Sequence, residues 1–583
     1  MQTPLYTIGT GCLIALTLTA GCVSPLSRTL EQELHEQLVL SQKAYREAIA
    51  AGPVIELSRP DSQVEKFLIE KNLLEQADRL GGPTSYQGIE LDTGRDLMGD
   101  TKTKSVSMTL QRAIELSVRN NLDVKLAQII PAISDTQVTQ AEAVFDATIF
   151  SNFSFQYLDT PQPPTAALGL AAFGAVQQKT IGFETGIRKL LPTGGQLTVS
   201  TGFNRNERNP SFFAVNSFYD SDVLVSITQP LLRNFGSDVT RSQIMLAESA
   251  RESAVEDLRG QLLTVVGNVE QSYWQLVFAR QQLHVQQRLY YKTIDLRKII
   301  EKRLIQDARI DSYTDALSRE ELRRADLIRA RSAVRQASDA LKQLIYANDL
   351  PLSAETLISP LESAPDLAMS FSLLDSVSTA LQKRPELRRA LLEIKDASIR
   401  ERVADNQRLP QLDLALSTRF NGVGLTSVGS AYDALGDGNF IDYIAGLNFE
   451  MPLGNRGPEA ALAQRQLERK ATVVNYRRTA QQVVRDVKDT MRALDTAYEI
   501  IGAARSARRA AGERLRVLLA QDELTPDFVD LMLRAQETLA NAEIQEIQAM
   551  AEYNTAIARY YQAIGTLLER NGIEFGEVAS KKD

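Results

Sequence analysis

The sequence predicts an α+β membrane protein in which amphipathic strands alternate with long antiparallel helical hairpins, arranged in two internal repeats. Three observations predict this class. Between residues 223 and 230, apolar side chains recur every second residue, as on a strand with one apolar face. From 236 to 304 they recur at helical spacing in a run without proline, enough for a rod of about 100 Å. A second strand-to-helix passage follows between residues 441 and 519.

Composition excludes several function classes. The chain has 583 residues and a formal net charge of −8, which disfavours a nucleic-acid partner. Its two cysteines, Cys12 and Cys22, lie within the first 22 residues, so the rest of the chain has no thiol chemistry. The two histidines, His35 and His284, have no metal ligands at suitable spacing. We therefore expect no enzyme activity, no metal and no cofactor, and an envelope hydrolase would lack its nucleophile and base.

The N-terminus carries a targeting segment. Residues 1–21 form a short apolar stretch followed by small residues, which predicts a signal peptide rather than a membrane span. The passage Thr19-Ala20-Gly21-Cys22 resembles a bacterial lipoprotein signal, which implies lipidation of Cys22; an ordinary signal peptide with an incidental cysteine is the alternative. Val23 after that cysteine is typical of sorting to the outer membrane. Residues 22–105 then form a periplasmic extension and linker, with helical patches at 28–51 and 63–80.

The two repeats follow in order. Leu110 recurs as Leu373 and Pro230 recurs as Pro452, so similar elements return along the chain. The first repeat, residues 106–350, is predicted to contain an opening helix broken near Asn120, then strands at about 146–158, 180–190, 195–206 and 221–230, a long helix 236–304 and a return helix 310–346. The second, residues 351–570, is predicted to contain a helix 371–407, strands at about 411–420 and 441–451, a long helix 458–519 and a return helix 526–568, before a tail at 571–583.

The first repeat is 41 residues longer than the second between its opening helix and its proline bend. The excess coincides with residues 179–207, where two alternating stretches flank the turn Pro192-Thr193-Gly194-Gly195. Alternation on both sides of a glycine-rich turn is typical of a β-hairpin. The sequence therefore predicts a hairpin in the first repeat that the second lacks.

All six strand candidates have one apolar and one polar face, as strands of a transmembrane barrel do. A soluble sandwich, whose strands also alternate, is the alternative. Connection lengths favour the barrel, because the link 159–178 is long and the turn 192–195 is short, as outer-membrane barrels require on their two sides. Six strands cannot close around a lumen and an open edge is excluded from lipid, so several copies must share one barrel.

The combination resembles the outer membrane efflux protein family, the TolC-like channels. The residues that carry the resemblance are LQRAIELSVRNNLDV, ITQPLLRNFG, VEQSYWQLV, QKRPELRRA and LPQLDLAL, in this order along both repeats. The resemblance implies a homotrimer whose strands form one β-barrel and whose helices form a periplasmic α-barrel. It also implies a periplasmic adaptor, an inner-membrane pump and outer-membrane lipid as partners. The family barrel has 12 strands; with the extra hairpin in the wall, this trimer would have 18.

The resemblance also implies functional residues at the periplasmic tip. Acidic residues beside the second helix-turn-helix narrow the pore, and here the matching candidates are Asp527 and Asp530. Three copies of either carboxylate around an axis would attract cations. Alternatively, Asp527 only complements the N-terminus of its helix, behind a capping Thr525 and Pro526. Candidate adaptor contacts are Asp307, Ala308, Asp522 and Glu523.

Two functions from different classes are consistent with these patterns. The first is a passive outer-membrane exit duct of a tripartite efflux or type I secretion system. The second is a periplasmic lipoprotein scaffold of coiled helices without a pore. The amphipathic strands favour the duct, because a scaffold has no use for them.

Overall fold

A computed structural model describes residues 43, 54–59, 62–82, 85, 90–99, 104–162, 174–208, 215–303, 310–521 and 526–574. The described residues fall into two compact units. The sheet unit takes its described residues from 133–252 and 391–475, and the helical unit takes its described residues from 39–132, 253–390 and 476–583. The signal peptide, Cys22 and the expected helix at 28–51, except Lys43, lie outside the described residues.

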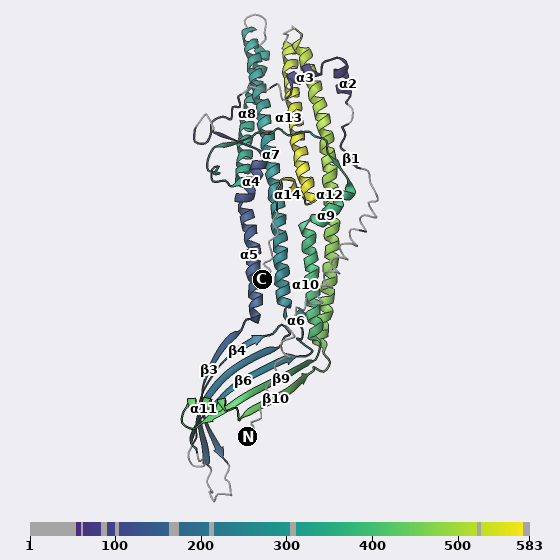
Figure 1. Ribbon diagram of the computed structural model, residues 1–583. Coiled ribbons are helices and arrows are strands. Elements are labelled where there is room, and N and C mark those ends of the chain that lie inside the picture. Colours follow the sequence, from purple (N-terminus) through teal and green to yellow (C-terminus); the bar gives the residue numbers. More distant parts are fainter. Residues whose placement is uncertain are drawn as a thin grey trace, which may run out of the picture. The chain divides into compact units, whose positions relative to one another are not determined.

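The sheet unit contains one antiparallel sheet of six strands (Figure 1). Every predicted strand segment overlaps an observed strand, and several strands are longer than predicted. In sheet order the strands are β10 (Ile441–Glu450), β9 (Gln411–Gly424), β6 (Ser217–Pro230), β5 (Gln196–Arg208), β4 (Gly174–Leu190) and β3 (Thr148–Gln162).

The extra hairpin of the first repeat is β4 and β5, and it lies inside the sheet. β4 pairs with β3 from Thr148↔Arg188 to Gln162↔Gly174, and β5 pairs with β6 from Gln196↔Thr228 to Glu207↔Ser217. The turn between them is closed by hydrogen bonds from the Leu191 amide to the Gly195 carbonyl, 2.7 Å, and from the Gly194 amide to the Leu191 carbonyl, 2.9 Å. Gly194 has φ of +90°, a conformation in which a side chain is strained.

Both strand-to-helix passages turn through the same pair of residue types. After β6, Asn234 and Gly236 have φ of 66° and 103°, and the chain enters α6 (Ser237–Thr240) and α7 (Ser242–Arg303). After β10, Gly454 and Asn455 have φ of 93° and 37°, and α12 (Arg456–Leu519) begins. Glycine and asparagine are the residues that adopt positive φ at least cost, which explains their presence at both bends.

The helical unit is built from the long helices and the helices that return beside them. Its elements include parts of α5 (Leu122–Glu142), α7, α10 (Pro385–Gln407) and α12, together with α4 (Leu110–Asn120), α8 (Ile310–Ile345), α9 (Leu373–Lys383), α13 (Pro526–Ala563) and α14 (Leu567–Arg570). Thr109 and Ser372 cap α4 and α9 by accepting hydrogen bonds from amides of the first turn. Tyr273 and Trp274 are buried in the main core, and the Tyr273 hydroxyl donates to the Met108 carbonyl at 3.2 Å.

Short elements complete the two units. In the helical unit, β1 (Ile55–Glu56) pairs antiparallel with β8 (Ser370–Phe371), and β2 (Ser105–Met108) pairs parallel with β7 (Leu357–Pro360). The same unit contains α2 (Gln63–Glu70) and α3 (Leu74–Leu80), and the sheet unit contains the 3-10 turn η2 (Ala143–Phe145). The sequence did not predict these two-stranded pairs, because runs of two to four residues have no readable period.

Two predicted extents require correction. The helix expected at 371–407 is interrupted at Arg384, which is extended because Pro385 follows it. The helix expected to reach 568 ends at Ala563, before Gly565 with φ of +76°, and α14 follows separately. The connection between β9 and β10 contains the helix α11 (Val428–Gly436), which the sequence did not predict. Among the described helices, no segment combines the length and apolar character needed to cross a bilayer.

Candidate functional site

The six-stranded sheet separates apolar and polar side chains onto opposite faces. Along β3, Ile149, Phe153, Phe155 and Tyr157 lie on one face. The register places apolar side chains of each of the other five strands on the same face. Many of these apolar residues are exposed to solvent in the single chain, with Phe153 at 72% and Leu447 at 68%, and others are partly buried. The shared face is lined by Ile181, Phe183, Ile187, Leu197, Val199, Phe203, Val223, Val225, Ile227, Leu412, Leu414, Leu416, Phe420, Ile441, Tyr443, Leu447 and Phe449. A broad exposed apolar face of this kind requires a nonaqueous partner.

The opposite face is linked by polar side chains across every strand pair. The contacts, in sheet order from β3, are Asn152 with Glu184 at 3.5 Å, Thr180 with Asn206 at 2.9 Å, Asn204 with Asp220 at 2.7 Å, Arg419 with Asp222 at 3.5 Å and Asn421 with Asp442 at 2.8 Å. A face of hydrogen-bonded polar groups is suited to contact with water. The sheet therefore has the two-sided chemistry of a barrel wall.

Glycines on the polar face allow these side chains to lie flat against the sheet. A Cβ on Gly182 would come within 2.5 Å of the Asn204 side-chain oxygen, and one on Gly186 would come within 2.6 Å of the Ser200 Cβ. A Cβ on Gly202 would come within 2.9 Å of the Asp222 carboxylate. All three glycines belong to β4 or β5. Their missing side chains leave room on the hairpin for side chains of adjacent strands.

Helix α11 covers one end of the apolar face. Gly422 and Gly424 of β9 are buried beneath it, and a Cβ on either glycine would overlap the backbone or side chain of residues 430 and 431. The Tyr432 hydroxyl lies 3.0 Å from the Thr201 hydroxyl of β5. The sequence Gly-Val-Gly at the end of a strand is a signal that could have indicated this close approach, and the sequence analysis did not use it.

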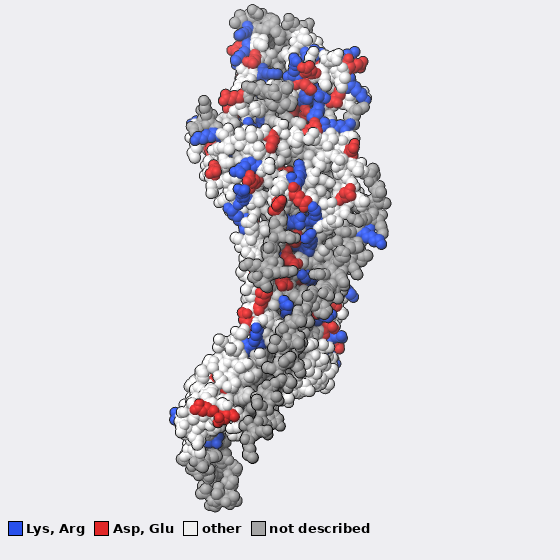
Figure 2. Space-filling view, in the orientation of Figure 1, with Lys and Arg blue, Asp and Glu red and all other residues white. Residues whose placement is uncertain are grey.

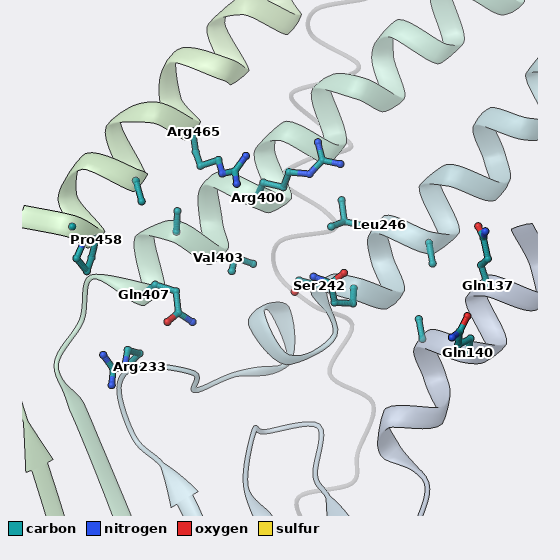
Figure 3. Close-up of a pocket in the computed structure, with 16 residues that line it drawn as sticks. Gln137, Gln140, Arg233, Ser242, Leu246, Arg400, Val403, Gln407, Pro458 and Arg465 are labelled. Atoms are coloured by element: carbon teal, nitrogen blue, oxygen red, sulfur yellow. The ribbon is translucent and has the colours of Figure 1, made fainter.

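A polar cavity lies within the sheet unit beside the strand-to-helix bends (Figure 3). Its volume is about 1000 Å³, and its polar lining includes Gln137, Gln140, Arg233, Arg400, Gln407 and Arg465. Arg233 donates to the Gln411 side chain at 2.5 Å, and Gln407 donates to the Asn234 side chain at 2.6 Å. The described lining has no His, Cys, Asp or Glu, so it lacks a nucleophile–base pair or a carboxylate for acid–base chemistry.

The predicted tip residues are only partly described. Asp530 of α13 accepts hydrogen bonds from Arg319 of α8 at 2.6 Å and pairs with Arg534 at 2.8 Å, so its charge is balanced locally by two guanidinium groups. Asp527 lies in the first turn of α13, and its side chain is outside the described set. Asp307, Ala308, Asp522 and Glu523 lie outside the described residues. The constriction and adaptor assignments therefore stay predictions.

The described residues between 54 and 99 form a strap that makes polar contacts with three long helices of the helical unit. On α12, the Arg59 guanidinium lies 4.2 Å from the Tyr498 ring centre. On α7, the Gln287 amide donates to the Glu90 carbonyl at 2.9 Å. On α8, Arg331 pairs with Asp92. The strap thus connects the α12–α13 hairpin to the α7–α8 hairpin, which the sequence did not predict.

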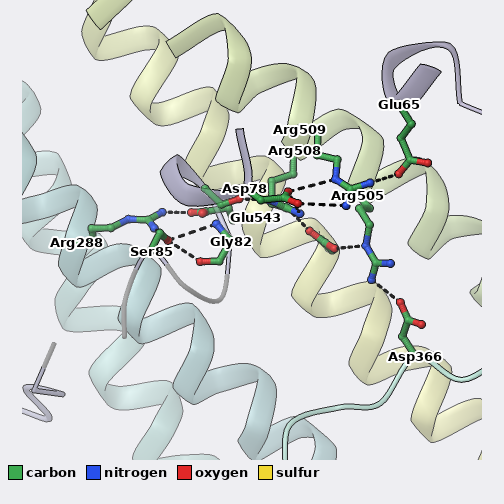
Figure 4. A network of polar contacts seen from close by, with 12 residues as sticks. Glu65, Asp78, Gly82, Ser85, Arg288, Asp366, Arg505, Arg508, Arg509 and Glu543 are labelled. Carbon is green, nitrogen blue, oxygen red and sulfur yellow. Dashed lines mark hydrogen bonds and ion pairs between the residues drawn. The ribbon is translucent and has the colours of Figure 1, made fainter. Parts of the chain in front are cut away.

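A network of arginines and carboxylates fixes the middle of the strap (Figure 4). Arg508 of α12 contacts the Gly81 carbonyl, Asp78 and Glu546, while Arg288 of α7 contacts Ser85 and Glu543. The side chains of Arg508 and Glu546 are 5% and 8% exposed, so this pair is buried. Arg505 extends the network to Asp366 at 2.5 Å, and Arg509 extends it to Glu65.

Burial affects the titration of several groups in this unit. It raises the pKa of Glu543 above its ordinary value, although the Arg288 charge opposes the shift. Burial likewise raises the pKa of Glu270, against a hydrogen bond from Asn571. The pKa of Lys292 is lowered by burial and by the neighbouring Arg288 charge. These groups pair with neighbouring polar and charged residues, Glu543 with Arg288 and Glu270 with Asn571 and Arg570, and none of them lines the described cavity.

The sequence contained a signal for the strap that the prediction did not use. Arg505, Arg508 and Arg509 occur at spacing i, i+3 and i+4 in an alanine-rich helix, so they share one face. Gly502 and Gly512 lie nearby on α12, and a Cβ at Gly512 would come within 3.0 Å of the Ala77 carbonyl. Glycines that disfavour a helix are retained where another backbone approaches closely.

The visible surface agrees with a structural rather than catalytic role for most charges. Figure 2 shows acidic and basic side chains interspersed along the helices and sparse over the strands on the face in view. In the part of the chain that the structure describes, no group of three or more His, Cys, Asp or Glu is arranged to hold a metal ion.

Comparison with known proteins shows a similarity to one family over about a third of the chain. Residues 376–566 match the family model described as outer membrane efflux protein. The resemblance to this family is thereby confirmed. The family's location in the outer membrane agrees with the expected localisation. A probable outer membrane lipoprotein, SilC of Salmonella typhimurium, is 25% identical over 307 residues, which are 52% of this chain and 62% of that protein. The chain therefore matches less than two thirds of this relative's length.

Solved structures of outer-membrane channels share the fold. The CmeC outer membrane channel of Campylobacter jejuni superimposes with a TM-score of 0.55 at 15% identity, over 82% of this chain and 92% of that chain. The open state of the MtrE outer membrane channel of Neisseria gonorrhoeae gives 0.53 at 17% identity, over 82% and 96%. The fold is therefore that of these mixed helix-and-strand channels.

Proposed function

We propose that this chain is one of three identical subunits of an outer-membrane exit duct. The duct is a passive channel that carries substrates from an inner-membrane pump across the periplasm and the outer membrane, in a tripartite efflux or type I secretion system. One observation carries the proposal: an amphipathic antiparallel sheet with two unpaired edges continues directly into helices of 62 and 64 residues.

The sheet supports the membrane part of the proposal. Its apolar face gains most by contact with lipid hydrocarbon, and its polar face then borders water. Within the described residues β3 and β10 are each paired on one side only. An open edge is not tolerated in lipid, and six strands are too few to enclose a lumen, so copies of the chain must complete the wall. The number three comes from the family, whose members are trimeric channels.

The helices support the periplasmic part. At about 1.5 Å per residue, α7 and α12 are each roughly 95 Å long, and each is followed by a return helix. Three copies of two such hairpins would enclose a helical tunnel. Cys22 would anchor each copy to the membrane by lipid, which the lipoprotein description of the Salmonella relative supports.

The main test is assembly and conductance. The purified full-length protein is expected to run as a heat-resistant trimer on a gel and to conduct ions in planar bilayers. A monomer without conductance would overturn the duct and leave the non-channel lipoprotein scaffold as the better function.

We further propose that the periplasmic end of the helices binds an adaptor protein. The turns that contain Asp307, Ala308, Asp522 and Glu523 would contact a periplasmic adaptor protein. A photocrosslinking residue placed at Asp307 or Asp522 is expected to capture an adaptor and, with it, an inner-membrane pump. A matched crosslinker on the exposed Asp489 of α12 is expected to capture neither. Equal capture from both positions would argue against a tip docking site.

Asp527 and Asp530 are proposed to narrow the pore with a ring of carboxylates. Asp530→Asn and Asp527→Asn are each expected to lower cation selectivity in planar bilayers, because each removes three negative charges from the ring. Asp489→Asn serves as the control, since its partner Arg492 is an exposed neighbour on the same helix. Selectivity and conductance unchanged in one variant would remove that residue from the constriction.

A further inference from the structure

We infer that the β4–β5 hairpin is part of the barrel wall, so that three copies form a barrel of 18 strands. This inference rests on the proposed trimeric duct and concerns the width of its lumen. The alternative is a hairpin that folds outside the wall or into the pore, which would leave four wall strands in each chain and 12 in the trimer.

Pairing on both sides of the hairpin supports the wall position. β3 pairs with β4 and β5 pairs with β6, each over at least twelve residue pairs, so the hairpin separates β3 from β6. If the hairpin lay outside the wall, β3 and β6 would have to pair with each other directly. The described sheet has no such pairing.

The outward face of the hairpin continues that of its neighbours. Phe153, Phe183 and Phe203 lie side by side on β3, β4 and β5, and the rings of Phe183 and Phe203 are 5.7 Å apart. Ile149, Ile187, Val199 and Val225 form a second apolar row across the same strands and β6. A hairpin outside the lipid would have no need for apolar residues in register with the wall.

The inward face is continuous as well. Thr180 and Asn206 join β4 to β5, Asn152 and Glu184 join β3 to β4, and Asn204 joins β5 to Asp220 of β6. A hairpin folded into the pore would lose the hydrogen bonds of β4 with β3 and those of β5 with β6. Buried polar groups would then be left without partners. Both faces therefore place the hairpin in the wall.

Closure of the barrel follows from the strand count. Neighbouring strands of the sheet are antiparallel throughout, and six is an even number, so β3 of one copy runs antiparallel to β10 of the next. The β3 edge is thus the surface that receives the β10 edge of a second copy of this chain. Outer-membrane barrels of a single chain likewise use even numbers of antiparallel strands.

The extra strands change what the barrel can pass. With strands about 4.8 Å apart and tilted about 40°, 18 strands give a backbone radius of roughly 18 Å, against roughly 12 Å for 12 strands. The cross-section inside the backbone is then about twofold larger. The barrel would admit bulkier cargo than a 12-stranded one, and any limit on cargo size would lie in the helical tunnel.

The experiment is electron cryomicroscopy of the full-length trimer, supported by disulfide crosslinking. Images are expected to show 18 strands, and 12 strands with residues 174–208 outside the wall would overturn the inference.

Phe153→Cys combined in turn with Tyr443→Cys, Ala445→Cys or Leu447→Cys is expected to link copies through β3 and β10. Phe153→Cys with Val225→Cys, on β3 and β6, is expected to give no link, and a strong link would also overturn it. A trimer that conducts but has 12 strands would refute only the strand count, whereas loss of the trimer would refute the proposed duct itself.

Discussion

The two units of this chain solve the problem of apolar surface in opposite ways. The sheet unit leaves its large apolar residues exposed, as Phe153 and Leu447 show, and keeps its polar groups in a hydrogen-bonded layer on the other face. The helical unit buries its apolar residues and also buries ion pairs such as Arg508 with Glu546. The difference indicates that the sheet is suited to a nonaqueous surrounding on one face, as the proposed barrel requires, whereas the packing of the helices is suited to water.

The largest expected effect tests the buried network of the helical unit. Arg508→Ala removes the buried guanidinium that contacts Glu546, Asp78 and the Gly81 carbonyl, and leaves Glu546 with Arg505 as its remaining guanidinium partner. Breaking a buried pair from one side costs about 3–5 kcal/mol. We expect a clear fall in the unfolding midpoint of the helices, followed by circular dichroism. Arg79→Ala removes an exposed pair with Glu75 and is expected to cost less than about 1 kcal/mol. Equal effects of the two substitutions would contradict a buried network that holds the strap.

The next prediction tests the two faces of the sheet. Phe153→Lys places a charge on the face assigned to lipid and is expected to cost about 2–4 kcal/mol near the middle of the bilayer. Asn152→Lys, the neighbouring residue on the polar face, is expected to cost far less. The measurement is the urea midpoint for unfolding from lipid vesicles. A larger cost at residue 152 than at 153 would reverse the assignment of the faces.

A smaller effect is expected from the glycines that pack the hairpin. Gly186→Val would press against the Ser200 Cβ and the Val199 carbonyl, both within 2.6 Å of the new Cβ, and overpacking costs about 1–3 kcal/mol. The control is Gly446→Val on β10, where nothing lies within 4 Å. Trimer yield and urea midpoint are measured for both variants. If Gly446→Val were the more harmful, β4 would not be packed in the sheet as described.

The smallest effect is a pH dependence in the helical unit. Burial raises the pKa of Glu270, so its contribution to stability is greatest below the unfolded pKa, near 4.5, and is lost as pH rises through the raised folded pKa. Glu270→Gln keeps a polar partner for Asn571 without the charge. We therefore expect the variant to gain in unfolding free energy relative to the native chain between pH 4 and pH 8. A difference that is constant across this range would show that folding does not shift the pKa of Glu270.

Sequence patterns predicted the elements with clear periodicity. The alternation in residues 223–230 and 411–420 and the helical spacing after residue 236 lead to β6, β9 and α7 with ends only a few residues away. The break at Arg384 was missed although Pro385 was visible, because the helical pattern on both sides outweighed one proline. The helix α11 was missed because its nine residues sit between polar loops and show no long period.

The candidate site was predictable only in part. The apolar and polar faces followed from the period of two, and the family resemblance followed from the order of short motifs. The arginines of α12 that share one face were a signal for a contact, but the partner of that contact was not predictable, because Asp78 and Arg508 are 430 residues apart and no local pattern relates them. The tip residues were proposed from the resemblance, and of these the structure describes the contacts of Asp530 alone.

The sequence by itself determined that strands with one apolar face pass into very long helices, since periodicity is a local property of the chain. It also determined that the first repeat carries an additional hairpin, because 41 extra residues alternate around a glycine turn. Only the tertiary structure decided where that hairpin lies. Its position between β3 and β6 depends on hydrogen bonds that β4 and β5 make with these neighbouring strands, and no single stretch of sequence shows which strands pair.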